Sequence, residues 1–149
     1  MSALSISLPD GSARELPAGS TVADLAASIG SRLAKAALTG VVNGSEVYLN
    51  VALANGDVVS IVTADSDAGR HVLRHSTAHV LAQAVTQLFP GAKFSVGPAI
   101  EDGFYYDFDL PEGRTFSETD LVAITARMKE IVSANQPFTR SEVSARDAL

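Results

Sequence analysis

The sequence predicts an α+β protein made of two small domains in succession. Three observations support this: alternating apolar residues near the N-terminus, a long helical pattern in the middle, and a glycine-punctuated aromatic segment after it. The 149 residues suffice for two modest cores. The 11 Lys and Arg against 17 Asp and Glu give a net charge of -6, which argues against a stand-alone nucleic-acid binder.

The first domain, residues 1–63, follows the order of two strands, a helix and three strands. Leu4, Ile6 and Leu8 alternate with serines, as in a half-buried strand, and a Pro-Asp-Gly turn at 9–11 folds it back. Ser20 or Thr21 can cap a helix that ends at Gly30. The remaining strands lie on either side of the Asn43-Gly44 turn within 38–50, and over 58–62. One helix covering one face of such a sheet predicts a β-grasp arrangement.

A polar linker over 64–70 leads into the second domain, residues 71–149. Its first element is a helix from about Ala68 to Phe89, which Pro90-Gly91 stops. The expected buried stripe of this helix is Leu73, Thr77, Val80, Leu81, Ala84 and Leu88. His75 and His79 lie on the opposite side, where the small side chains of Ala82 and Thr86 leave room for another group to approach.

Histidines four residues apart point the same way from adjacent helical turns. This spacing suits two imidazoles that serve one metal or one substrate, but a solvated or capping pair has the same spacing. The segment "KFSVGPAIEDGFYYDFDL" that follows favours the interpretation of the two histidines as part of a functional site. It contains a Gly97-Pro98 break, and Tyr105 and Tyr106 must point to opposite faces of a strand, so one phenol faces away from the core.

The last part of the chain predicts a helix that Ser117 caps and that runs to Asn135, then a strand over 138–144. Ser144 opens a further helix, of which only five residues follow. We therefore expect the second domain to be incomplete and the chain to be an N-terminal piece. The N-terminus shows no signal peptide and no run of about 20 apolar residues occurs, so we expect a cytoplasmic protein without a membrane span.

Two resemblances follow from these motifs. The segments "LPDGSARELPAGSTVADLAASIG", "AALTGVVNGSEVYLN" and "NGDVVSIVT" resemble the TGS domain, a ubiquitin-like β-grasp module. The segment "RHSTAHVLAQAVTQLFPGAKFSVGPAIEDGFYYDFDL" is similar to the start of the editing domain of bacterial-type threonyl-tRNA synthetases. This second resemblance implies a domain that hydrolyses seryl-tRNA made in error for threonyl-tRNA.

The resemblance also implies roles for individual residues. His75 and His79 correspond to two editing histidines, and Tyr106 and the Gly97-Pro98 backbone to contacts with the substrate. His71 has no counterpart in the motif, so we interpret it as solvated. The family completes its site with a later Cys-x-x-x-His segment, a lysine and an aspartate, whereas this chain has no cysteine. We therefore expect the chain alone to be inactive and to hold no metal, unless residues beyond Leu149 complete a site at the two histidines.

For the parent protein the resemblance implies a threonine-tRNA ligase that acts on tRNA(Thr). It implies ATP with magnesium, zinc, and a homodimer formed through a catalytic domain outside this sequence, and no cofactor bound by the chain itself. A second hypothesis remains open: a naturally short TGS-bearing protein that binds RNA, a nucleotide or a partner without catalysis. The residues alone do not exclude it.

Overall fold

The computed structural model describes residues 3–148 and divides into two compact units. Unit 1 comprises Met1–Ser76 and Ala99–Phe104, and unit 2 comprises Thr77–Pro98 and Tyr105–Leu149. The division therefore falls inside the long helix α3 (Asp67–Leu88), and residues 67–70 of the predicted linker are helical. The predicted domain bounds 1–63, 64–70 and 71–149 remain a prediction.

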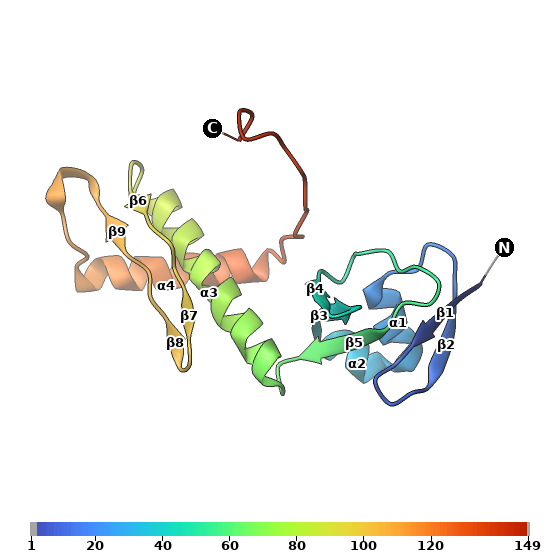
Figure 1. Ribbon diagram of the computed structural model, residues 1–149. Helices are drawn as coiled ribbons and strands as arrows, with labels where there is room; N and C mark the ends of the chain where they lie inside the picture. The colour runs from blue at the N-terminus through green and yellow to red at the C-terminus, as the bar shows by residue number, and fades with distance from the viewer. Residues whose placement is uncertain (1–2, 149) are drawn as a thin grey trace. The chain divides into compact units, whose positions relative to one another are not determined.

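Unit 1 contains the sheet-forming first part of the chain (Figure 1). Strands β1 (Ala3–Ser7) and β2 (Ala13–Pro17) form an antiparallel pair. Strands β3 (Ala37–Val42), β4 (Ser45–Val47) and β5 (Val59–Thr63) form an antiparallel sheet in the order β4-β3-β5. A parallel bridge between Ser7 and Val58 links β1 to the residue before β5. The predicted strand and helix order is confirmed, with one helix more than expected.

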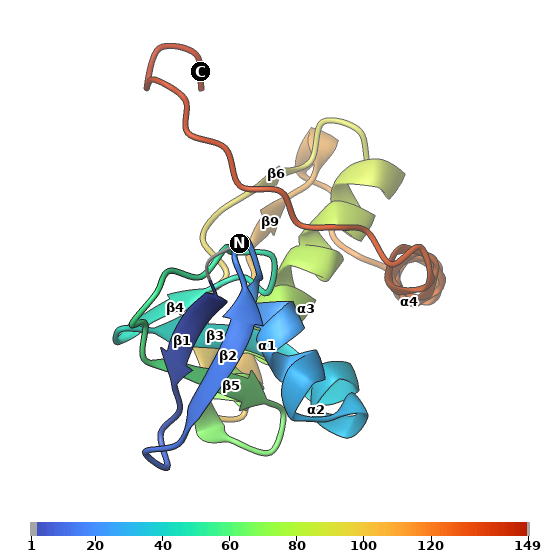
Figure 2. The same cartoon turned by 90° about the vertical axis from the view of Figure 1, so that its right-hand side faces the viewer.

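Helices α1 (Val22–Ile29) and α2 (Ser31–Ala36) lie on the same side of these strands (Figure 2). Thr21 and Asp24 start α1 with a capping box, because each side chain bonds to the other residue's backbone N–H. A Cβ on Gly40 of β3 would lie 2.5 Å from Cγ1 of Val22, so only glycine lets α1 pack this closely on the sheet. The buried core is Ile6, Leu16, Val22, Leu25, Leu53 and Val59.

The buried face of α3 agrees in part with the predicted stripe, since Ala84 is buried and Val80, Leu81 and Leu88 pack against the core of unit 2. Leu73 is 42% exposed and Thr77 is also exposed, whereas Ala78, Ala82, Ala84 and Val85 are buried. The prediction followed the large aliphatic side chains, but the helix buries mainly small ones, whose short side chains permit close approach.

None of the helices in residues 3–148 combines the length and the apolar character needed to cross a membrane.

Unit 2 packs the C-terminal half of α3 against helix α4 (Glu118–Ser133) (Figure 1). Between them the chain forms two-residue strands β6 (Lys93–Phe94) and β9 (Phe108–Asp109), which pair antiparallel, and the short helix η1 (Pro111–Gly113). The core comprises Ala84, Val85, Leu110, Ile124 and Ile131. Strands β7 (Ala99–Ile100) and β8 (Gly103–Phe104) pair through the predicted turn and are counted with unit 1.

The segment after α4 departs from the prediction. The helix ends at Ser133, and Asn135 adopts a left-handed conformation with φ 48°. Residues 138–144 form no strand, because no neighbouring strand of the described chain pairs with them. Ser144 opens a single turn rather than a helix, in which its hydroxyl accepts a hydrogen bond from the backbone N–H of Asp147. Leu149, which the predicted helix included, lies outside the described residues.

Candidate functional site

The two motif histidines lie one turn apart on α3 and both are exposed. The spacing of four residues places them on the same face of the helix, as predicted. The prediction of open space beside the two histidines is wrong at Ala82, because this residue is only 6% exposed. Thr86 is half-buried, and its hydroxyl donates a hydrogen bond of 2.9 Å to the carbonyl oxygen of Ala82. The helix surface one turn beyond His79 is therefore covered by protein.

The other predicted residues meet in the segment that follows α3. Gly97 lies directly against the ring of Tyr106, because a Cβ at this position would lie 2.9 Å from Cγ of the ring and closer still to Cδ2 and Cε2. Any side chain at position 97 would thus displace the ring. The backbone N–H of Tyr105 donates a hydrogen bond of 3.2 Å to the carbonyl oxygen of Pro98 and holds the two segments together.

Two phenylalanines complete the surroundings of Tyr106. The Phe108 ring stacks on it with centroids 4.9 Å apart and an interplanar angle of 13°. The Phe94 ring meets it edge to face at 6.0 Å, and Phe94 is the direct strand partner of Phe108. Tyr106 is half-buried, whereas Tyr105 is 64% exposed. The prediction that one of the two phenols faces away from the core is confirmed at Tyr105, although residues 105–107 form no strand.

The structure thus groups the candidate residues in two sets. One is His75 and His79 on α3, and the other is Gly97, Pro98 and Tyr106 in the hairpin of unit 2. The roles of all five residues in one site remain a prediction. The contact of Gly97 with Tyr106 and the stacking of Phe108 were not predicted from the sequence. The spacing of Tyr106 and Phe108 was a usable signal, since residues two apart share one face of a strand.

Three carboxylates outside the candidate set have lowered pKa values. Hydrogen bonds from the backbone and hydroxyl of Thr21 lower the pKa of Asp24, and those of Ser117 lower the pKa of Asp120, with a further contribution from Arg114. Bonds from the hydroxyl and backbone of Ser12 lower the pKa of Asp10. All three carboxylates hold a turn or a helix start, so we assign them a structural role.

The described residues also line several surface hollows. His71 is exposed and lines one of about 620 Å³ with Arg70, Arg74, Glu101 and Asp102. A shallow hollow of about 340 Å³ runs over the β6–β9 pair. Another, of about 390 Å³, lies along α4 and is lined by Leu121, Val122, Thr125, Ala126 and Lys129.

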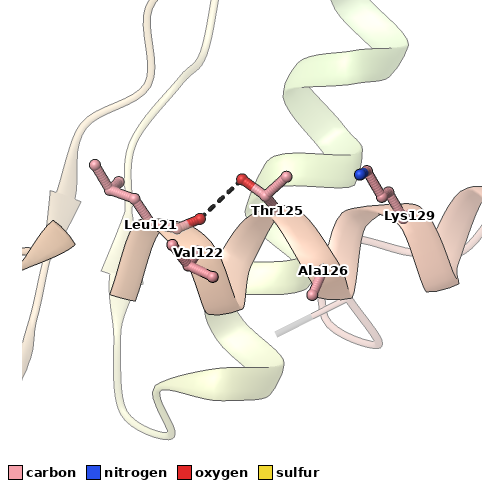
Figure 3. Close-up of a pocket in the computed structure, with 5 residues that line it drawn as sticks. All are labelled: Leu121, Val122, Thr125, Ala126 and Lys129. Atoms are coloured by element: carbon pink, nitrogen blue, oxygen red, sulfur yellow. Dashed lines mark hydrogen bonds between the residues drawn. The ribbon is translucent and has the colours of Figure 1, made fainter. Parts of the chain in front are cut away.

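The α4 hollow offers little for chemistry. Its lining is mostly apolar, and the Thr125 hydroxyl already donates a hydrogen bond of 2.8 Å to the carbonyl oxygen of Leu121 (Figure 3). Lys129 is the single ionisable side chain of this lining. Within residues 3–148, no three His, Cys, Asp or Glu side chains are grouped so that they could hold a metal ion.

Comparison with known proteins places this geometry in context. Residues 4–63 match the TGS domain family. The whole chain is 52% identical over 149 residues to a threonine–tRNA ligase of Pelobacter propionicus, and covers 23% of that protein. Ligases of the same name match at 53% over 135 residues in Saccharophagus degradans and at 49% over 146 residues in Maricaulis maris. These matches cover 91% and 98% of this chain, but 21% and 22% of those proteins.

The similarity continues far beyond the TGS domain. Residues 64–149, including the histidine pair and the Gly97–Tyr106 contact, fall within the full-length match to the P. propionicus ligase. The chain spans less than a quarter of the length of this relative. Residues 4–63 thus form a TGS domain, and the chain over its whole length is homologous to the N-terminal region of bacterial threonine–tRNA ligases.

Proposed function

We propose that this chain is the N-terminal region of a threonine–tRNA ligase and supplies part of a site that hydrolyses seryl-tRNA(Thr). The observation that carries the proposal is the match to such ligases over all 149 residues. It also disfavours the alternative of a short TGS-bearing binding protein, since the similarity does not stop at residue 63.

The need for such a site follows from the size of the amino acids. Serine lacks only the methyl group of threonine, and a difference of one methyl or methylene yields about 10- to 200-fold discrimination in a binding pocket. Accurate translation demands more than this. A second site that removes serine from tRNA(Thr) after the first reaction supplies the missing discrimination.

The candidate residues suit the chemistry of ester hydrolysis. A water oxygen attacks the carbonyl carbon of the seryl ester and gives up a proton, and the bond to the terminal ribose oxygen breaks as that oxygen takes up a proton. Imidazole side chains transfer protons near neutral pH, so we assign this work to His75 and His79. Their exposure on α3 leaves them accessible to a tRNA end.

Tyr106 and the backbone of Gly97 and Pro98 are the proposed substrate contacts. The ring of Tyr106 is held between the Gly97 backbone and Phe108, so its position is largely fixed before any ligand binds. A fixed contact loses little conformational entropy on binding. This packing supports a role in orienting the seryl ester.

Other properties of the proposed ligase belong to residues outside this sequence. ATP with magnesium, zinc and the dimer contact are assigned to a catalytic domain, and the partner is tRNA(Thr). We place the ligase in the cytoplasm. The two histidines alone are one or two ligands short of a closed zinc site, so no metal is assigned to this chain.

A chimera tests the proposal. The 149 residues of this chain replace the matching region of the P. propionicus ligase, and the control lacks this region. We expect both proteins to charge tRNA(Thr) with threonine, and only the chimera to clear seryl-tRNA(Thr). A chimera that charges threonine but clears seryl-tRNA no faster than the deletion control would contradict the proposal. The isolated 149-residue chain is expected to clear none.

A further inference from the structure

Tyr106 belongs to a row of aromatic rings that leads into the core of unit 2. Its ring stacks on Phe108, which meets Phe116 edge to face at 5.9 Å and 80°. Phe116 in turn meets Phe89 at 5.6 Å and 72°. Phe89, Phe108 and Phe116 all pack against the buried cluster of this unit. The row therefore connects Tyr106 to the buried core of its unit.

The Tyr106 ring is restrained by contacts of different kinds. The Gly97 backbone lies against it, Phe108 stacks on it, and Phe94 touches it edge to face. Phe108 adds a near-parallel stack, a geometry that stabilises aromatic pairs beyond the area they bury. Removal of Phe108 frees the ring to turn, while Gly97 and Phe94 remain.

We propose that Phe108 is a positioning residue for Tyr106 in the hydrolysis of seryl-tRNA(Thr). The inference rests on the proposed function and adds a residue that does not itself touch the substrate. Its physical basis is preorganisation, because a contact residue acts well only when neighbouring packing fixes its own rotamer. A misplacement of about 1 Å at a reaction site can cost about 100-fold in rate.

Phe116 offers a matched control. Phe108 and Phe116 are both half-buried, both pack against the same core, and they contact each other. Only Phe108 stacks on Tyr106. Phe108→Leu and Phe116→Leu therefore remove the same ring from the same cluster, but only the first removes a restraint on Tyr106. Phe108→Tyr keeps the stacking ring and serves as the conservative variant.

The first readout is structural and uses the 149-residue chain. Because the Tyr106 ring lies on Gly97, its ring current shifts the Gly97 Hα signals in the proton NMR spectrum. We expect these signals to keep their positions in Phe116→Leu and Phe108→Tyr, and to move toward random-coil values in Phe108→Leu. Unchanged signals in Phe108→Leu would show that Phe108 does not position the ring.

The second readout is clearance of seryl-tRNA(Thr) by the chimera. We expect Phe108→Leu to slow clearance by about 10- to 100-fold, while Phe108→Tyr and Phe116→Leu stay close to the parent and threonine charging is unchanged. If Phe108→Leu clears like Phe116→Leu while a variant with alanine at positions 75 and 79 is inactive, the assignment of Phe108 alone is overturned. If the His75→Ala/His79→Ala variant also clears seryl-tRNA(Thr) normally, both the proposed function and the role of Phe108 are overturned.

Discussion

The two units of this chain use their apolar residues differently. In residues 3–63 of unit 1 the strands are three to six residues long, and Ile6, Val22, Leu25 and Val59 are fully buried in the core between α1 and the strands. In unit 2 the strands have two residues each, and Val96, Val122 and Val143 are 63–81% exposed.

This difference separates scaffold from candidate site. The TGS domain turns its apolar faces inward and holds Asp10 in a turn and Asp24 in a helix cap. In unit 2, half-buried aromatic rings form a row from the core to the candidate residue Tyr106.

The largest effect expected from this comparison concerns a pair of leucines. Leu25 is 0% exposed in the TGS core, whereas Leu121 on α4 is 54% exposed. Leu25→Ala should lower the free energy of unfolding of the TGS domain by about 2–5 kcal/mol, because it leaves a cavity. Leu121→Ala should change stability by less than about 0.5 kcal/mol. Urea titrations followed through the amide NMR signals of each unit measure both stability changes. Equal losses of stability in the two variants would refute the difference between the two leucines.

A pair of glycines gives the next largest effect. Gly97→Ala forces the Tyr106 ring to move, whereas a Cβ on Gly103 meets no atom within 4 Å and φ there is not positive. We expect Gly97→Ala to destabilise unit 2 by about 1–3 kcal/mol, as overpacking does. Gly103→Ala is the control and should be close to neutral. Thermal unfolding monitored through the Tyr106 ring signals checks this, and a neutral Gly97→Ala would contradict the close packing.

A smaller effect, and one that raises stability, is expected when a buried hydroxyl in the TGS sheet is removed. Thr39 is 6% exposed, and its Oγ1 has no hydrogen-bond partner among the described residues. Thr39→Val keeps the shape and removes the unsatisfied group, so it should raise stability by about 1 kcal/mol. Thr125→Val, which loses the bond to Leu121, should bring no gain. The denaturant midpoints of the two variants measure these changes. A lower midpoint for Thr39→Val than for the parent would refute the interpretation of the Thr39 hydroxyl as an unsatisfied buried group.

The smallest effect is one that the two units share. The pKa values of Asp24 and Asp120 are lowered by the capping residues Thr21 and Ser117. Their stabilisation is present above the ordinary pKa of a carboxyl and is lost as the pH falls through the lowered value. Thr21→Ala and Ser117→Ala should each reduce the loss of stability on acidification in the unit that contains the substitution. Melting temperatures between about pH 6 and about pH 2 test it, with the parent chain as reference.

The sequence predicted local features better than distant contacts. The strand order of the TGS domain, the capping of α4 by Ser117 and the facing of one phenol, that of Tyr105, away from the core all follow from neighbours in the chain. Helix α2 was missed because it is short and follows Gly30 without a side-chain cap.

The errors arose where packing partners lie far apart in sequence. Burial of Ala82 and exposure of Leu73 depend on what covers α3, which helical periodicity does not reveal. The contact of Gly97 with Tyr106 joins two sides of a hairpin, and nothing in either segment alone predicts it. The strand expected over 138–144 failed for the same reason, since a strand needs a neighbour to pair with.

The most direct test of the account is replacement of both His75 and His79 by alanine in the chimera. Both side chains are exposed on α3, so their loss should open no cavity in the core and threonine charging should stay close to the parent. Loss of proton transfer by the imidazoles should slow clearance of seryl-tRNA(Thr) by about 100- to 10,000-fold. Clearance at the parent's rate would show that the two histidines are only a solvated face of the helix.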